Sequence, residues 1–368
     1  MKKIKILLIE GGLRFGGVEK SSIEFMRKIS TCADVDLLLW KNRERELETP
    51  MEVREITVPT VNSVRYAIKT YGLLSRWTIL SILASFCKKR WKVMPKLKKE
   101  YDVAIAFSHA GFDKYYVIDK VNAKKKFTFY HNGAYTFSDD IRRLDKEYYP
   151  KYDKIFAVSE HIKDLLHNEI SSQLNIEVLH NLVDINGIIE NGKAPCKVMD
   201  AYEGLKIVTV GRLSAEKNPL KIIEVCKELK KEKIDFRWYV IGDGPLKNDM
   251  IKNIEDAKLH EYCILCGSQK NPYCFMSRAD IYVQLSKYEA EPITIQEVAI
   301  FGVPMVLSKI DGFSRYANIF NNITLVDDEP LKIAQAIISD NNKRAYHIDK
   351  IKELQSIEEE KINNIILN

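Results

Sequence analysis

Short apolar runs alternate along the chain with segments of helical periodicity. In the first half, residues 5–9 form an apolar run that ends in glycines, and residues 18–29 repeat apolar side chains at helical spacing. Further runs rich in β-branched and aromatic residues occur at 35–40, 103–107, 126–130, 154–158 and 176–179. Strands that are apolar throughout and alternate with helices are typical of a parallel α/β sheet covered on both faces.

The same alternation restarts after residues 191–204, a stretch with two Gly and one Pro that predicts a linker. Strands are then expected at 205–210, 236–241, 263–265, 281–285 and 305–307, and helices at 219–231, 247–257, 272–277, 292–301, 331–339 and 349–367. The pattern predicts an α/β protein of two tandem doubly wound domains. The crevice between the carboxyl ends of their strands is the expected ligand site.

The predicted domain boundaries follow from this restart. An N-terminal domain is expected at 1–190, the linker at 191–204 and a C-terminal domain at 205–345. Residues 346–368 are expected to form a helix that packs back toward the N-terminal domain. The length of 368 residues supports two domains, because a single core seldom grows past about 250–300 residues.

Composition narrows the class of protein. With 46% apolar and 29% charged residues, the chain can bury a core, which excludes wholesale disorder. The first apolar run is too short for a signal peptide. The weakly charged stretch 77–87 has 11 residues, whereas about 20 are needed to span a bilayer. Seven cysteines without a framework spacing suit a reducing compartment, so we expect a cytoplasmic protein.

One cysteine cluster superficially resembles a zinc site. His260, Cys263 and Cys266 are each three residues apart, and Cys274 follows. The segment around the first two cysteines predicts a strand, where a separation of three sends two side chains to opposite faces. Buried structural cysteines are therefore the favoured interpretation.

The formal charge of +6 has a local origin. Residues 60–99 contain ten basic residues and no acidic one. Apolar residues within 77–87 share one helical face between basic ends, and Trp91 follows among lysines, which is a membrane-surface pattern. Residues 65–99 thus predict contact with an anionic membrane. A core-facing helix with snorkelling lysines is the alternative, and nucleic-acid binding is disfavoured because no nucleic-acid module is present.

Two acidic residues flank a predicted helix start in the second half. Glu289 precedes Pro292, and Glu297 lies seven intervening residues after Glu289. The first-turn N–H groups near Ile293 and Thr294 form an anion site, and a carboxylate at Glu297 beside a phosphate suits the diol of a ribose. A solvated helix face and a loop charge are the alternative reading of these two carboxylates.

Two cations follow the first strand of the second half. Arg212 and Lys217 lie at the carboxyl end of that strand, before a helix. A fixed guanidinium and a flexible ammonium together suit a diphosphate. A surface lysine and an arginine in a domain-interface salt bridge are the structural alternative.

The motifs taken together resemble the family 4 retaining glycosyltransferases of the GT-B fold. The motifs that carry the resemblance are Gly16-Gly-Val-Glu19, Asn181-Leu-Val-Asp184, Gly211-Arg-Leu213 with Lys217-Asn-Pro219, Gly242-Asp-Gly-Pro245, Glu289-x2-Pro292-x4-Glu297, and Gly302-Val-Pro304. They follow the family's order over essentially the whole chain. The resemblance implies two Rossmann-like domains facing each other across a deep cleft.

The resemblance also implies a role for each site residue. Arg212 and Lys217 would neutralise the donor diphosphate, Glu297 would bind the ribose, and Glu289 would orient the transferred sugar. In the same way, the backbone of Gly16 and Gly17 would approach the phosphate, Ile293 and Thr294 would contribute their N–H groups, and His131 would lie near the donor sugar. Packing at a turn is the alternative for His131. Gly242 and Gly244 are expected to form a structural turn rather than a contact.

Three departures from the family pattern stand out. Glu291 adds negative charge near the diphosphate site, where an apolar residue or glycine is usual, so we expect it to point away or to meet a sugar hydroxyl. Gln296 stands where an apolar residue is common. The segment 308–316 lacks the family's glutamate after its glycine, which leaves its contacts open.

The expected activity is transfer of a sugar, with retention, from a nucleotide-diphosphate donor, taken as a UDP-sugar. The acceptor would be a glycan or lipid-linked glycan in bacterial capsule, lipopolysaccharide or exopolysaccharide synthesis. No metal or other cofactor is expected, because placed cations serve the diphosphate and no Asp-x-Asp is present. Nicotinamide, P-loop and serine-hydrolase motifs are absent. The alternatives are a catalytically weak glycosyltransferase-like partner subunit and a nucleotide-sugar epimerase on the same fold.

Overall fold

A computed structural model describes residues 3–14, 16–41, 45–58, 72, 75, 78–79, 82 and 89–367. The chain divides into two compact units. Unit 1 comprises residues 1–182 and 357–368, and unit 2 comprises residues 183–356. This division corrects the predicted linker at 191–204. That stretch contains helix α8 (Lys197–Asp200), and Cys196 and Met199 are buried in the core of unit 2.

Unit 1 contains a seven-stranded parallel sheet in the order β3-β2-β1-β4-β5-β6-β7. Its strands are β1 (Ile4–Gly12), β2 (Ala33–Lys41), β3 (Arg54–Ile56), β4 (Glu100–Ala106), β5 (Asn122–Tyr130), β6 (Lys154–Ala157) and β7 (Ile176–Val178). The helices described in this unit are α1 (Gly17–Ser30), α4 (Asp113–Lys120), α5 (Asp139–Tyr148), α6 (Glu160–Glu169) and the end of α15 (Ile348–Leu367). The strand order reverses between β1 and β4.

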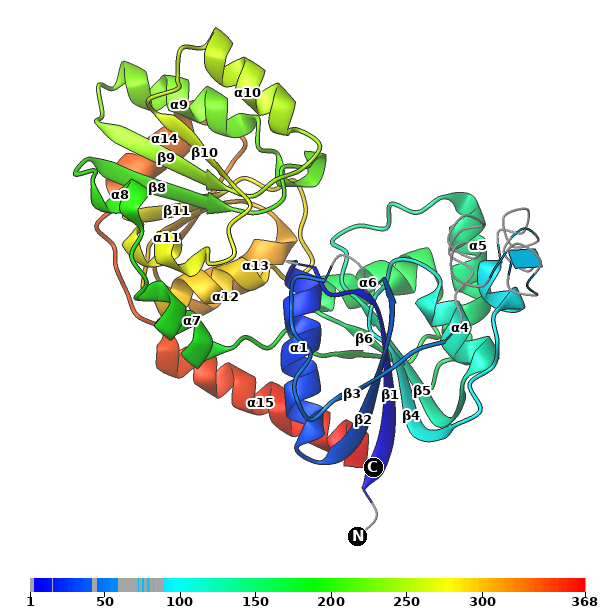
Figure 1. Ribbon diagram of the computed structural model, residues 1–368. Helices are drawn as coiled ribbons and strands as arrows, with labels where there is room; N and C mark the ends of the chain where they lie inside the picture. The colour runs from blue at the N-terminus through cyan, green and yellow to red at the C-terminus, as the bar shows by residue number, and fades with distance from the viewer. Residues whose placement is uncertain are drawn as a thin grey trace. The chain divides into compact units, whose positions relative to one another are not determined.

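Both faces of this sheet are covered, as the apolar strands predict. Ile6 to Ile9 on β1 are all fully buried, so successive side chains pack on opposite faces. On one face, α1 and the last turns of α15 lie side by side (Figure 1). Ile362 and Ile366 of α15 share the core cluster of α1, and Lys28 pairs with Glu359 at 2.7 Å.

The opposite face of unit 1 is packed by α4 and α5 around a buried ion pair. Lys114 of α4 contacts Asp145 of α5 at 2.8 Å, and both side chains are almost fully buried. The hydroxyl groups of Tyr115 and Tyr135 donate to the same carboxylate at 2.6 and 2.8 Å. Burial lowers the pKa of Lys114, because a desolvated ammonium is unfavourable. The carboxylate of Asp145 has the opposite effect, because it pairs with the ammonium.

Unit 2 contains a six-stranded parallel sheet in the order β10-β9-β8-β11-β12-β13. Its strands are β8 (Leu205–Val210), β9 (Phe236–Ile241), β10 (Cys263–Gly267), β11 (Ile281–Gln284), β12 (Met305–Ser308) and β13 (Ile323–Val326). Its helices are α7 (Ile185–Gly192), α8, α9 (Lys221–Lys231), α10 (Lys247–Asp256), α11 (Tyr273–Arg278), α12 (Ile293–Ile300), α13 (Asp311–Ile319), α14 (Pro330–Asp340) and the start of α15. Its order reverses between β8 and β11.

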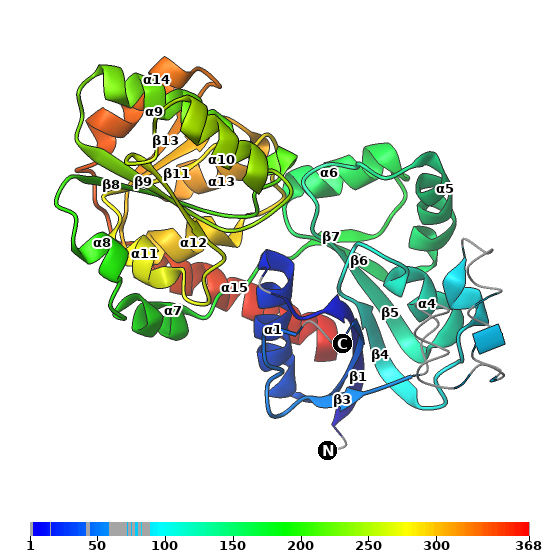
Figure 2. The same cartoon turned by 45° about the horizontal axis from the view of Figure 1, so that its top comes forward.

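Two apolar clusters cover the two faces of the unit 2 sheet. One joins the sheet to α9, α10 and α14, and the other joins it to α7, α8, α11, α12 and α13 (Figure 2). Cys263 packs in the first cluster and Cys266 against the second, which confirms that the strand sends them to opposite faces. Among the described residues, no group of three or more His, Cys, Asp or Glu is arranged to hold a metal.

Most of the basic segment, including the predicted helical face at 77–87, lies outside the described residues. Three of its described residues, Thr78, Trp91 and Met94, are buried. Trp91 is 1% exposed and donates from its indole nitrogen to Asp119 at 2.7 Å, and Met94 is 2% exposed. Trp91 and Met94 therefore belong to the core of unit 1 and not to a membrane-facing surface. Within the described ranges, no helix is both long enough and apolar enough to cross a membrane.

Candidate functional site

The switch point of the unit 2 sheet brings the predicted donor residues to one edge. In open parallel sheets, ligands bind where neighbouring strands diverge at their carboxyl ends. Here Arg212 follows β8, and Glu289 follows β11. Lys217 ends a short 3₁₀ turn after β8, and its ammonium forms an ion pair with Oε1 of Glu289. Two predicted site residues that are 72 positions apart are thus in direct contact.

The carboxylate of Glu289 is held by further donors. Ser286 Oγ donates to Oε1 of Glu289 at 2.6 Å, and Gln284 Nε2 donates to the same oxygen at 2.8 Å. The side chain of Glu289 remains 10% exposed. A carboxylate fixed through one oxygen and reachable through the other is a preorganised acceptor for a hydroxyl group.

Arg212 keeps its guanidinium available. Its side chain is exposed, and it forms no ion pair with any residue in the described part of the chain. The loop that carries it is held by glycines, because a Cβ at Gly242 would overlap the carbonyl oxygen of Gly211, and one at Gly244 would overlap that of Leu213. These two glycines therefore have a packing role, in agreement with the predicted structural turn.

Helix α12 begins directly beside this cluster. Pro292 is its N-cap residue, and Ile293 and Thr294 are the first helical residues. First-turn N–H groups have no partner within the helix, so the start of α12 can bind an anion. Ile293 is buried, whereas Thr294 is partly exposed and donates from its hydroxyl group to Gln284 Oε1 at 3.0 Å.

Glu297 lies deeper on α12 than the sequence pattern suggests. The residue is 1% exposed, and its Oε1 accepts a hydrogen bond from the hydroxyl group of Tyr273 on α11 at 3.0 Å. Tyr273 thus fixes the orientation of the carboxylate predicted to bind a ribose. Sequence reasoning missed Tyr273, because nothing in the spacing links it to a residue 24 positions away.

Two of the three departures from the family pattern involve residues that contact each other. Arg315 on α13 donates to Oε1 of Glu291 at 2.8 Å, and the side chain of Glu291 is 2% exposed. The arginine in the segment 308–316 thus neutralises the carboxylate of Glu291. That Glu291 points away from the diphosphate or meets a sugar hydroxyl stays a prediction. Gln296, the third departure, is buried and donates to the hydroxyl oxygen of Tyr316 at 3.2 Å.

In unit 1, the switch point between β1 and β4 carries a different set of groups. His131 follows β5, stacks on the ring of Phe129 at 5.5 Å and forms a hydrogen bond with the backbone of Phe107. Its Nε2 atom is buried and has no hydrogen-bond partner among the described residues. Burial, together with the nearby ring of His109, lowers the pKa of His131 to about 3.

His109 is a functional candidate that the sequence analysis missed. It lies just beyond β4, with its ring 6.3 Å from that of His131 between centroids. Burial and the positive charge of Lys114 lower its pKa to about 4. Both histidines are therefore neutral at physiological pH. The sequence signal that could have identified His109 is its position just after a strand, which it shares with His131.

Acidic groups lie at the end of β1. Glu10 is 2% exposed, its Oε1 accepts from the backbone N–H of Gly11 at 2.8 Å, and its pKa is raised by burial and by Asp113 and Glu19. Gly16 is the N-cap of α1 and Gly17 its first residue, and the carboxylate of Glu19 lies over Gly16. Acidic side chains beside this turn are unfavourable to a bound phosphate. The contact of Gly16 and Gly17 with the phosphate stays a prediction.

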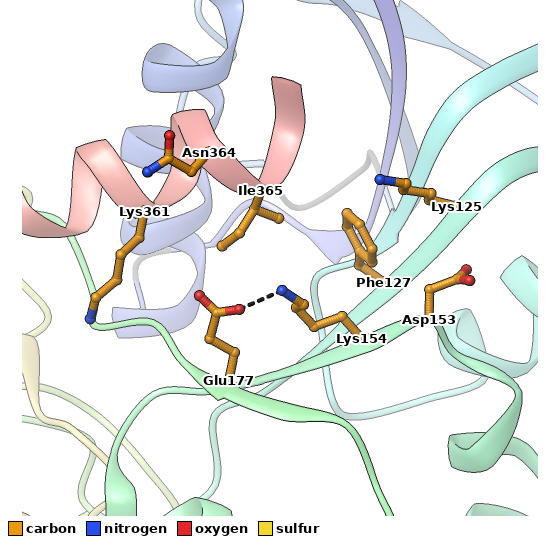
Figure 3. Close-up of a pocket in the computed structure, with 8 residues that line it drawn as sticks. All are labelled: Lys125, Phe127, Asp153, Lys154, Glu177, Lys361, Asn364 and Ile365. Carbon is orange, nitrogen blue, oxygen red and sulfur yellow. Dashed lines mark hydrogen bonds and ion pairs between the residues drawn. The ribbon is translucent and has the colours of Figure 1, made fainter. Parts of the chain in front are cut away.

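A cavity of about 480 Å³ lies elsewhere on unit 1, under the end of α15 (Figure 3). It is lined by Phe127 and Ile365 together with charged residues, of which Lys154 pairs with Glu177 across the opening. The cavity adjoins the amino ends of β6 and β7, whereas the candidate residues lie at carboxyl ends. It is therefore distinct from the candidate site.

Comparison with known proteins gives a matching family model. Residues 201–353 match the model of the glycosyl transferases group 1 family, which covers the candidate cluster of unit 2. The chain is 30% identical over 142 residues to an N-acetylgalactosamine-N,N'-diacetylbacillosaminyl-diphospho-undecaprenol 4-alpha-N-acetylgalactosaminyltransferase of Campylobacter jejuni, covering 38% of this chain and 37% of that protein.

A second relative comes from Escherichia coli. The chain is 30% identical over 146 residues to its UDP-Gal:alpha-D-GlcNAc-diphosphoundecaprenol alpha-1,3-galactosyltransferase, covering 38% of each protein. The matched region thus spans well under half the length of these curated relatives.

Solved structures resemble the chain over nearly its full length. The crystal structure of Anabaena HepE in complex with UDP and glucose has a TM-score of 0.69 and 15% identity, covering 99% of this chain and 98% of that one. At this identity the similarity shows the fold alone. The predicted GT-B class, built from two Rossmann-like domains, is confirmed.

Proposed function

We propose that this protein is a retaining glycosyltransferase that uses a nucleotide-diphosphate sugar, with a UDP-sugar as the donor. The observation that carries the proposal is the cluster at the switch point of unit 2. There, Lys217 contacts Glu289 next to the start of α12, and Arg212 is exposed. The family model matches this same unit, and relatives with sugar-transferring names support the reaction class.

The chemistry follows from the charges of these residues. When the diphosphate leaves, negative charge grows on its oxygens and positive charge on the anomeric carbon. Arg212, Lys217 and the first-turn N–H groups of α12 would stabilise the departing diphosphate. The exposed oxygen of Glu289 would accept a hydrogen bond from the sugar and orient it, and Glu297 would bind the ribose. The leaving phosphate would take the proton of the incoming hydroxyl on the same face.

Unit 1 would supply the acceptor side of the reaction. Its histidines are neutral and can exchange hydrogen bonds with hydroxyl groups without adding charge. Both relatives' names specify a diphospho-undecaprenol-linked substrate. We accordingly propose a glycan or lipid-linked glycan acceptor in the synthesis of a bacterial surface polysaccharide. In this proposal no metal serves the diphosphate, and the chain works in the cytoplasm at the inner face of the membrane.

Turnover of a donor panel tests the activity. Purified protein is incubated with UDP-glucose, UDP-galactose, UDP-N-acetylglucosamine and UDP-N-acetylgalactosamine, and released UDP is measured with and without EDTA. We expect release from at least one donor, unchanged by EDTA, and a loss of about 100-fold or more in Lys217→Ala and in Glu289→Gln. Near-native turnover by either variant would contradict the roles proposed for Lys217 and Glu289.

The same panel separates the alternatives. A catalytically weak partner subunit would bind UDP without releasing it from any donor, and an epimerase would interconvert donor sugars without an acceptor. An uncompensated charge of Glu291 beside the diphosphate site would favour the weak partner, and its pairing with Arg315 removes that charge. The glycosyltransferase interpretation is therefore better supported than the weak partner.

Membrane association through residues 65–99 has its own test. Co-sedimentation with phosphatidylglycerol vesicles at low salt should exceed that with phosphatidylcholine vesicles, because basic segments are drawn to anionic lipid. Equal recovery with the two vesicle types would argue for a basic segment that packs on the protein.

A further inference from the structure

The carboxylate of Glu289 is anchored on one side only. Its Oε1 accepts from Lys217 Nζ, Ser286 Oγ and Gln284 Nε2, whereas its Oε2 forms no hydrogen bond with any residue that the structure describes. A carboxylate held by several donors loses much of its rotational freedom, so the direction of its remaining lone pairs is set in advance. The atom available to a substrate is Oε2.

Gln284 and Ser286 are the two buried donors, whereas Lys217 is partly exposed. Gln284 is the last residue of β11 and is 2% exposed, whereas Lys217 remains 25% exposed at its side chain. A carboxamide in such a place must satisfy both its donor and its acceptor, because an unpaired buried polar group costs about 1–3 kcal/mol. The neighbours of Gln284 satisfy both.

The acceptor side of Gln284 links two further elements. Its Oε1 accepts from the hydroxyl group of Tyr282, two residues earlier on the same face of β11, at 2.8 Å. It also accepts from the hydroxyl group of Thr294 in the first turn of α12 at 3.0 Å. Since a carboxylate can only accept, the amide nitrogen must face Glu289 and the amide oxygen must face these hydroxyl groups.

One amide therefore connects the strand end, the loop of Glu289 and the helix start that is proposed to meet the diphosphate. A Leu at this position would fill the space but would leave four polar side chains without their shared partner, since the amide nitrogen also donates to Ser286 Oγ at 3.3 Å. The second link between the loop and α12 is covalent and passes through Pro292. The amide is the side-chain link that sets the carboxylate relative to Thr294.

We propose that Gln284 is a positioning residue that locks the carboxylate of Glu289 against the start of α12, so that Oε2 faces the donor sugar. This inference rests on the proposed glycosyltransferase function and adds a residue to it. Gln284 contacts neither sugar nor phosphate in this account. It acts through Glu289 and Thr294.

The decisive substitution is Gln284→Glu. When protonated, the introduced carboxyl can still donate to Glu289 and accept from Tyr282 and Thr294. When ionised, it loses the donor and repels the neighbouring carboxylate, whose proximity raises the pKa of the introduced group above its usual value near 4.3. Turnover of UDP-sugar relative to the native enzyme should be close to 1 at pH 5.5 and fall about 10-fold or more at pH 8.5.

Two controls separate positioning from loss of structure. Gln284→Leu should reduce turnover about 10- to 100-fold at both pH values while the Kd for UDP stays within about twofold of native, because UDP lacks the sugar that Glu289 would meet. Gln355→Glu, which removes a glutamine hydrogen bond to the Val183 carbonyl oxygen in the same unit, should leave the pH profile unchanged.

A readout that is independent of activity completes the test. By urea unfolding at pH 8.5, Gln284→Glu should be destabilised, and the exchange Gln284→Glu with Glu289→Gln should recover most of that loss, because the donor and the acceptor trade places. The exchanged protein should remain inactive on the sugar panel.

These experiments distinguish a failure of the positioning role of Gln284 from a failure of the proposed function. Native-like turnover and stability of Gln284→Glu at pH 8.5, or an exchange that recovers nothing, overturns the positioning role alone. If the native protein releases UDP from none of the four donors, the proposed function fails, and the sugar-facing role of Oε2 fails with it.

Discussion

Both units place polar side chains at the switch point of a parallel sheet, between β1 and β4 in unit 1 and between β8 and β11 in unit 2. In unit 2 the edge is charged. Arg212 is exposed, and the ion pair of Lys217 with Glu289 leaves one carboxylate oxygen without a partner among the described residues. In unit 1, burial drives His109 and His131 to their neutral forms. The same topology thus carries two chemistries, one suited to an anionic ligand and one to hydroxyl groups.

The ion pair of Lys114 with Asp145 in unit 1 is almost fully buried and serves the fold. Lys114 and Asp145 are 2% and 0% exposed, whereas Lys217 and Glu289 of unit 2 are 25% and 10% exposed. Removing one partner of a fully buried pair leaves a desolvated charge, and removing one partner of a solvated pair does not. Truncation of the unit 1 pair should therefore cost more stability than truncation of the unit 2 pair.

The largest expected effect is on the stability of unit 1. Asp145→Ala should lower the free energy of unfolding by about 3–5 kcal/mol, because it strands the ammonium of Lys114 and two tyrosine hydroxyl groups. Lys217→Ala should cost about 1 kcal/mol or less while abolishing most turnover. Urea unfolding monitored by circular dichroism measures both, and equal losses in the two variants would break the comparison.

A smaller effect on stability is expected when the pH is lowered, through the neutral side chain of His131 in unit 1. The folded pKa of His131, about 3, lies below the unfolded value of about 6.5, so the unfolded state binds the extra proton on acidification. Stability is present above the unfolded pKa and is lost as the pH falls below it. Between pH 7 and pH 5, native protein should lose about 1–2 kcal/mol more than His131→Phe.

Unfolding midpoints at several pH values between 7 and 5 provide the measurement. The comparison of native protein with the variant cancels the contributions of Glu10 and other titrating groups. Parallel stability curves for the two proteins would show that His131 is not buried in its neutral form.

The smallest effect on stability concerns the ion pair of Glu291 with Arg315 in unit 2. Arg315→Ala removes the arginine that pairs with the buried carboxylate of Glu291, and because the arginine is 29% exposed, we expect a cost of about 1 kcal/mol. Adding Glu291→Gln should cost little further. A double-mutant cycle by urea unfolding measures the coupling, and additive losses would show that the two departures are independent.

The sequence allowed much of the architecture to be predicted. Apolar strands with nearly complete burial and the restart of the pattern in the second half identify two doubly wound sheets. Strand ends followed by charged residues locate Arg212 and Glu289 correctly at the unit 2 edge. These features are local, so spacing and residue type suffice to find them.

Other features depend on tertiary contacts that no local pattern carries. Residues 191–204 looked like a linker by composition, yet Cys196 and Met199 pack in the core of unit 2. Short elements that are stabilised mainly by packing escaped detection, among them β3, α4, α5, α13 and β13. The contacts of Glu291 with Arg315 and of Glu297 with Tyr273 join residues 24 positions apart and become visible only in the folded chain.

We propose that the β8 and β11 edge of unit 2 binds a nucleoside diphosphate through the cations of Arg212 and Lys217. Calorimetric titration with UDP tests it most directly, in native protein and in the double variant Arg212→Ala with Lys217→Ala. We expect native protein to bind UDP and the double variant to bind it at least about 10-fold more weakly, since two charge-assisted contacts are lost. Equal affinity in the two proteins, or no binding by the native one, would contradict it.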